Sequence, residues 1–106
     1  MTTPTNFAVP VPEAGANAIA TFNITGLRKL KEKFGDDYAM TLLRAFDLAD
    51  VDAIEFVAGI AIVGGPSHVA MEALSVADLT GRLADALMLR LKGMTVAELE
   101  ADIERP

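Results

Sequence analysis

The spacing of apolar residues along the chain changes near Gly26, from alternation to a helical period. Residues Ala18–Thr25 alternate apolar with small or polar side chains, which is typical of a β-strand. Before them, Phe7–Pro12 has the composition of an extended segment whose prolines restrict it to the edge of a sheet. Turn-like residues 13–17 separate the two segments, so the pattern predicts a β-hairpin. Because an isolated hairpin is only marginally stable, we expect it to pack on the helices that follow.

After Gly26, apolar residues recur at helical spacing, and start and stop signals divide the chain into helices. Aspartate, serine and threonine favour the position before a helix, and glycine favours the position after one. The predicted helices, with the residues that bound them, run from Gly26 to Gly35, from Asp36 or Asp37 past Phe46, from Asp50 to Gly64-Gly65, from Ser67 to about Leu74, from Ser75 to about Lys92, and from Thr95 to Glu104.

These elements fit one domain. We expect a flexible tail at residues 1–6 and a single helical domain with an N-terminal hairpin at residues 7–106. The predicted fold class is mostly α, with a short N-terminal β-hairpin followed by a compact bundle of about five to six helices.

Two of the predicted helices carry more apolar residues than one buried face needs. Val51–Val63 is apolar most of the way round, and Val76–Leu91 has a wide stripe of leucines. The chain is 52% hydrophobic with a mean hydropathy of +0.36, and a small domain cannot bury all of that. We therefore expect apolar surface that meets another protein chain. The alternative is that alanine raises the hydrophobic fraction and that Val51–Val63 is simply the central helix of the bundle.

The apolar positions of these two helices form a pool of candidate partner-binding residues, in which the sequence pattern does not separate interface from core. Five methionines, Met71, Met88 and Met94 among them, fit such a surface, since flexible methionines suit variable apolar partners. The candidate pool consists of Ile54, Val57, Ile60, Leu83, Leu87, Met88 and Leu91.

Charge narrows the classes of partner. A net charge of −6 disfavours nucleic acid, because phosphate backbones attract clustered Lys and Arg. The one basic cluster, Arg28–Lys33, is expected to be a solvated helix face, although it could instead dock on the acidic C-terminal helix of another copy. The longest near-apolar stretch, Val51–Val63, is shorter than the ~20 residues of a membrane span. The first residues lack the features of a signal peptide, so we expect a cytoplasmic protein that binds no membrane.

Residues for catalysis or metal binding are sparse. Cysteine is absent and His68 is the only histidine, with no recognisable partners; we expect it on a helix surface. The acidic stretch Asp47–Glu55 lacks the ligand spacing of an EF-hand, and aspartates at the start of a helix suit the helix dipole. Gly64-Gly65 matches neither phosphate-binding glycine pattern. We therefore expect no enzymatic activity, no metal and no cofactor.

The order of elements between residues 18 and 93 has a counterpart in a known family. A short strand leads into a Leu-x-x-Leu helix that ends near Phe34-Gly35, an Asp-started apolar helix closes at Gly64-Gly65, and a Leu-rich helix ends at Lys92-Gly93. This arrangement resembles the small tail assembly chaperones of long-tailed phages, of the type encoded in gene transfer agents. The resemblance implies a non-enzymatic chaperone of the bacterial host cytoplasm. Such chaperones bind the helical, apolar tape measure protein and keep it soluble while the tail tube assembles.

Two other classes of protein remain as alternatives. One is a structural subunit of a virion, tail or connector, and the other is a small acidic inhibitor that binds a basic protein. In the chaperone interpretation the partner is a protein client, and we expect the chain to form homo-oligomers as well.

Overall fold

The computed structural model describes residues 8–93 and residue 101 of the chain. Its helices are α1 (Ile24–Phe34), α2 (Tyr38–Asp47), α3 (Val51–Ala61), α4 (Ser67–Ala73) and α5 (Val76–Lys92), with a short 3₁₀ helix η1 (Pro12–Ala14). Its strands are β1 (Val9–Pro10), β2 (Ile19–Ala20) and β3 (Ile62–Val63). The predicted fold class is confirmed: a short hairpin precedes a compact set of helices. The predicted tail, residues 1–6, and nearly all of the predicted last helix, residues 95–104, lie outside the described residues.

The three strands form one small antiparallel sheet in the order β1-β2-β3. Val9 pairs with Ala20 across the hairpin, and Ala20 pairs with Ile62 on the other side. The strand that contains Pro10 lies at the edge of the sheet, as predicted, because proline has no N–H to donate to a second neighbour.

The prediction of a helix through Val63 is wrong by two residues. The helix α3 ends at Ala61, and Ile62 takes extended backbone angles to enter β3. Consecutive β-branched residues favour a strand, and pairing with β2 satisfies their backbone groups. The amide of Thr21 also donates to the carbonyl of Ala61, at 2.9 Å, so the hairpin continues onto the end of α3.

Side-chain caps mark the start of α1, α3 and α5, whereas Asp37, before α2, makes no side-chain cap hydrogen bond. The prediction placed the first helix at Gly26, but α1 begins at Ile24 because the side chain of Asn23 accepts a hydrogen bond from the amide of Gly26 at 2.7 Å. The predicted caps of the third and fifth helices are confirmed. Asp50 accepts from the amide of Ala53 at 3.3 Å, and Ser75 accepts from Asp78 at 3.1 Å.

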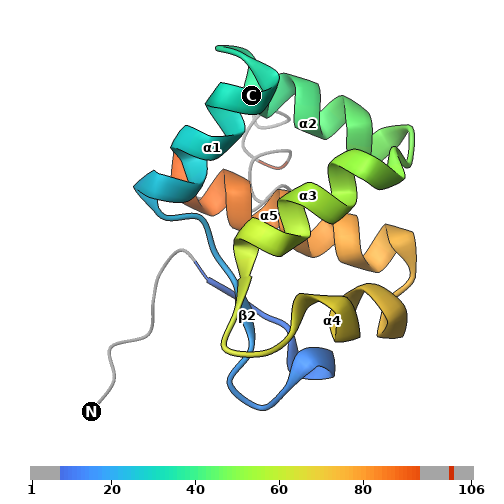
Figure 1. The fold of residues 1–106 in the computed structure, drawn as a ribbon. Helices are drawn as coiled ribbons and strands as arrows, with labels where there is room; N and C mark the ends of the chain where they lie inside the picture. Colours follow the sequence, from blue (N-terminus) through green and yellow to red (C-terminus); the bar gives the residue numbers. More distant parts are fainter. Residues whose placement is uncertain (1–7, 94–100, 102–106) are drawn as a thin grey trace.

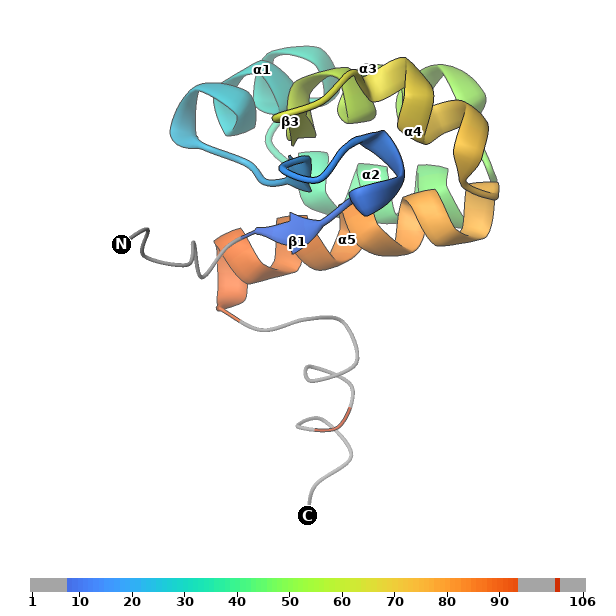
Figure 2. The ribbon, with the colours of Figure 1, turned by 90° about the horizontal axis from the view of Figure 1, so that it is seen from below.

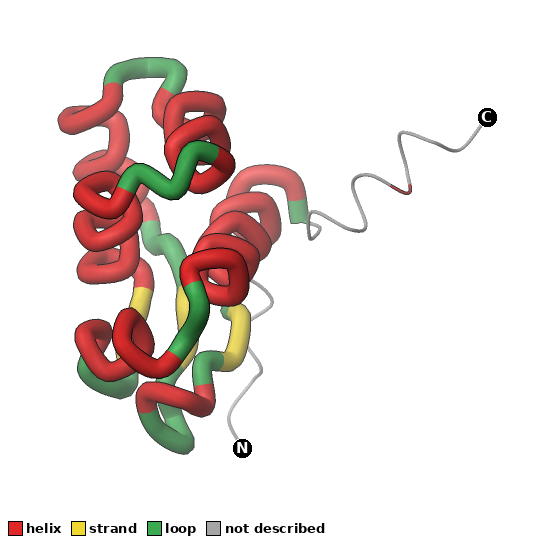
Figure 3. The backbone as a smooth tube through the Cα atoms, turned by 90° about the vertical axis from the view of Figure 1, so that its right-hand side faces the viewer, coloured by secondary structure: helices red, strands yellow, loops and turns green. Residues whose placement is uncertain are grey.

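The helix α5 packs against much of the fold. It contacts α2, α3 and α4 as well as strands β1 and β2. In Figure 1 it runs behind α3, and Figure 2 shows it along one side of the molecule with β1 beside it. Figure 3 shows the short strands gathered towards one end, with the helices around them.

Almost every helix and strand contributes buried side chains to the hydrophobic core. Burying a large apolar side chain contributes about 1.5–3 kcal/mol to folding, so these side chains account for much of the driving force. The largest fully buried ones are Val11, Phe22, Leu30, Leu42, Val57, Leu83 and Leu87.

Gly64 and Gly65 bring the loop after β3 directly onto the turn of the hairpin. A Cβ at Gly64 would overlap the carbonyl oxygen of Asn17, and one at Gly65 would overlap that of Ala14. Gly64 also has a φ of +78°, a left-handed conformation that glycine adopts without strain. Close packing of two backbones therefore explains this glycine pair.

Candidate functional site

The structure divides the seven candidate partner-binding residues between core and surface. Ile60 and Leu91 are half-buried and pack at the margin of the core. Side chains at the other five positions are enclosed within the folded chain, and in this fold they stabilise α3 and α5 instead of lining an open surface. These buried residues are Ile54, Val57, Leu83, Leu87 and Met88.

The large apolar side chains that stay exposed lie elsewhere, mainly around α2. Met40 on α2, Leu48 just after it and Val51 at the start of α3 are each more than 60% exposed, at 71%, 75% and 65%. Val76, at the start of α5, is 47% exposed. None of these four residues belongs to the candidate pool. The sequence pattern marks Val51 and Val76 as apolar positions of their helices, but periodicity does not show that a helix's first residue stays exposed. Met40 and Leu48 lie outside the two helices from which the pool is drawn.

A hollow of about 600 Å³ lies between α2 and α5, and the exposed Val76 is among the residues that line it. Its apolar walls come from Leu43 and Phe46 on α2 and from Val76 and Ala84 on α5. A second hollow runs along α2 and adjoins the first, since Leu43 and Asp47 line both. We refer to the two together as the α2–α5 groove. Its lining residues are Asp37, Met40, Thr41, Leu43, Arg44, Phe46, Asp47, Ala49, Val76, Ala77, Thr80, Gly81 and Ala84.

The α5 wall of the groove is made of small residues. Ala77, Gly81 and Ala84 are spaced by four and three positions, so they share one face of the helix. A Cβ at Gly81 would meet no atom within 4 Å. The distance between packed helices depends on the side chains at the contact, so this wall allows the backbone of a partner helix to approach closely.

Thr80, the buried polar residue among those that line the groove, has its hydrogen bond within α5. The hydroxyl of Thr80, a buried residue, donates to the carbonyl of Ala77 at 3.2 Å. Over the described residues, no buried side-chain nitrogen or oxygen lacks a hydrogen-bond partner. The interior wall of the groove therefore favours an apolar occupant over a polar one.

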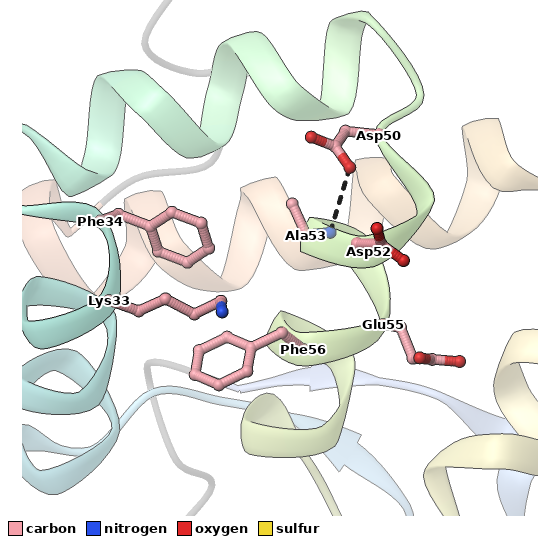
Figure 4. Close-up of a pocket in the computed structure, with 7 residues that line it drawn as sticks. All are labelled: Lys33, Phe34, Asp50, Asp52, Ala53, Glu55 and Phe56. Carbon is pink, nitrogen blue, oxygen red and sulfur yellow. Dashed lines mark hydrogen bonds between the residues drawn. The ribbon is translucent and has the colours of Figure 1, made fainter.

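A separate hollow, of about 470 Å³, lies between α1 and α3, and several of the side chains that line it contact one another (Figure 4). The rings of Phe34 and Phe56 meet edge to face, with centroids 5.9 Å apart. The ammonium of Lys33 lies 4.8 Å from the Phe56 centroid and 5.9 Å from that of Phe34. Aromatic and cation–π attraction therefore hold α1 against α3. Among the carboxylates at the other wall, Asp50 serves as the cap of α3.

One ion pair ties the N-terminal segment to α5. The guanidinium of Arg82 binds both carboxylate oxygens of Glu13, the Nη2–Oε2 distance being 2.9 Å. This bidentate hydrogen bond lowers the pKa of Glu13 from its usual 4.5 and raises the pKa of Arg82. The pair joins η1 to α5, and neither residue lines the groove.

His68 is exposed in the first turn of α4, where the sequence placed it. Within residues 8–93, no group of three His, Asp or Glu side chains is arranged to hold a metal ion. No helix in that part of the chain has the length and apolar character to cross a membrane.

Comparisons of the chain with protein-family models, with curated proteins and with solved structures give no match.

Proposed function

We propose that this protein is a non-enzymatic binding protein that holds an apolar helical segment of a client protein in the α2–α5 groove. The observation that carries the proposal is the groove itself, which is lined by Leu43 and Phe46 and by the exposed apolar side chains of Met40 and Val76. Contiguous exposed apolar surface on a small protein is typical of partner sites. An amphipathic helix laid in a groove is a common way to cover such a surface.

The resemblance of residues 18–93 to phage tail assembly chaperones supports a specific client. In that interpretation the client is the helical tape measure protein, which exposes long apolar surfaces before the tail tube encloses it. A groove with an apolar floor and a small-residue wall suits a succession of similar helical segments, because close approach there does not depend on one particular side chain.

A pair of matched glycine substitutions tests the groove. Gly81 and Gly59 are both exposed helical glycines whose Cβ would meet no atom within 4 Å, but only Gly81 lines the groove. We expect Gly81→Leu to fill the hollow and weaken client binding at least about tenfold, and Gly59→Leu to leave it unchanged. The measurement is co-expression with the tape measure protein, followed by pull-down and quantification of soluble client.

Circular dichroism of both variants controls for folding. Equal client binding by a folded Gly81→Leu variant would remove the groove as the binding site. Recovery of the protein from purified tail particles would favour the structural-subunit alternative instead, since such chaperones leave before the particle is complete.

A further inference from the structure

The charged residues at the α2–α5 groove indicate which charges its occupant carries beside its own apolar stripe. Asp37 and Asp47 are exposed residues that line the groove along α2. On α5, the exposed Asp78 lies three residues before Gly81, hence next to it on the helix surface. Arg44 is the cationic residue among those that line the groove in the described chain. Two carboxylates and one guanidinium thus line the groove, and a third carboxylate, that of Asp78, lies beside its α5 wall.

Two ion pairs of the described chain join Lys31 to Asp36, at 3.6 Å, and Arg82 to Glu13, and neither includes these three carboxylates. Arg82 also interacts electrostatically with Asp78, but its guanidinium is already bound by Glu13, so the group of Glu13, Arg82 and Asp78 keeps a net charge of −1. The chain as a whole carries a net charge of −6. The potential around the groove is therefore negative, which attracts cations and repels acidic segments.

We infer that the α2–α5 groove selects an amphipathic helix whose apolar stripe is bordered on both sides by lysine or arginine. This inference rests on the proposed function and specifies the chemistry of the client. The apolar stripe covers Leu43, Phe46 and Val76, while basic side chains on its two borders reach Asp47 on one side and Asp78 on the other. Charges at the rim of an interface mainly set specificity, orientation and association rate, so they choose among apolar helices that would otherwise bind alike.

A second copy of this chain is the less favoured occupant. The segment of a second copy that would best supply an apolar stripe with basic borders is α1, where the exposed Ile24 lies beside the basic cluster Arg28–Lys33. Two cations of that cluster already have contacts within their own chain, because Lys31 pairs with Asp36 and Lys33 lies over the ring of Phe56. The basic border that the groove selects is therefore better supplied by a client.

Two synthetic helical peptides of about 20 residues provide the test on the full-length protein. They share one stripe of leucine and alanine, and they carry either lysine or glutamate at every position that borders it. We expect the lysine peptide to bind about tenfold more tightly by isothermal titration calorimetry at about 50 mM salt. The ratio should shrink at about 500 mM salt, where exposed charges are screened.

Two matched double variants test whether Asp47 and Asp78 cause the preference for the lysine peptide. Asp47→Asn combined with Asp78→Asn should bring the two peptides within about twofold of each other. Glu32→Gln combined with Glu72→Gln changes the net charge by the same amount at exposed positions outside the groove, and should keep the preference. Thermal unfolding of each double variant controls for folding.

The outcomes separate this inference from the proposed function. Equal affinity for both peptides, with binding lost in Gly81→Leu, would overturn the charge selection and leave the groove in place. Binding of neither peptide, or binding that Gly81→Leu does not affect, would overturn the groove and the inference together. Salt-sensitive self-association that disappears in the Asp47→Asn, Asp78→Asn variant would assign the groove to a second copy and overturn the client assignment.

Discussion

Single glycines have opposite roles in this protein. Gly64 is needed by the fold, because its φ is +78° and a Cβ there would overlap the backbone of Asn17. Gly81 is not needed by the fold, since it lies inside α5 with open space where a Cβ would stand. A glycine within a helix costs about 0.5–1 kcal/mol relative to alanine. The groove supplies a reason for Gly81, whereas nothing in the structure explains the equally exposed Gly59.

Alanine substitutions measure this contrast. We expect Gly81→Ala to raise the free energy of unfolding by up to about 1 kcal/mol, because alanine is the better helix former. Gly64→Ala should lower it by about 1–3 kcal/mol, since alanine is strained in that conformation and would displace the hairpin turn. Urea denaturation of the two variants is the measurement. A destabilised Gly81→Ala variant would mean that the α5 wall is closed and not open.

At the scale of elements, η1 and α5 are far apart in sequence and are joined by the pair Glu13–Arg82. The pair anchors the N-terminal segment, whose backbone also continues the hairpin through the bond from the Val11 amide to the carbonyl of Ala18, at 2.9 Å. Its contribution depends on ionised Glu13, and so on pH.

The Glu13–Arg82 pair should stabilise the fold at neutral pH and not in acid. The pKa of Glu13 is lowered by Arg82 in the folded state, so the unfolded chain takes up a proton first as the pH falls. The stabilisation is present above the usual pKa of 4.5 and disappears as the pH drops through the lowered, folded value. Glu13→Gln should therefore lower the urea midpoint at pH 7 and leave it unchanged well below that value. A deficit that persisted in acid would assign the effect to packing.

At the scale of the whole molecule, α5 is a two-sided element. One side, with Leu83 and Leu87, is fully buried against the other helices and the hairpin. The other side, with Ala77 and Gly81, forms a wall of the groove. Stability and binding are thus assigned to different faces of the same helix, and substitutions should separate them.

Leu87→Ala and Val76→Ala test this separation. Leu87 is completely buried, so its truncation should lower the free energy of unfolding by about 2–5 kcal/mol. Val76 lines the groove and is 47% exposed, so its truncation should change stability by no more than about 0.5 kcal/mol while weakening the binding of the lysine-bordered peptide. Chemical denaturation and calorimetric titration measure the two effects. A strongly destabilised Val76→Ala variant would place that residue in the core.

Much of the helical layout could be predicted because its signals are local. Asp50 and Ser75 cap helices through bonds to amides three residues away, and Gly93 ends α5 in a left-handed conformation. The end of α3 could not be predicted in this way. Ile62 leaves the helix because it pairs with Ala20, a residue far away in sequence. The spacing of apolar residues around Ile62 contains no signal of that pairing.

The amino-acid sequence by itself determined which segments become helices, where most of them begin and end, and that the chain has apolar surface to bury. Only the tertiary structure decided which apolar residues are buried. Val57 and Leu87 are enclosed, whereas Met40 and Leu48 stay exposed. The physical reason is that hydrophobicity sets the cost of contact with water, while coverage of a side chain depends on which other elements pack beside it. The groove between α2 and α5 exists only where two helices, distant in sequence, lie together.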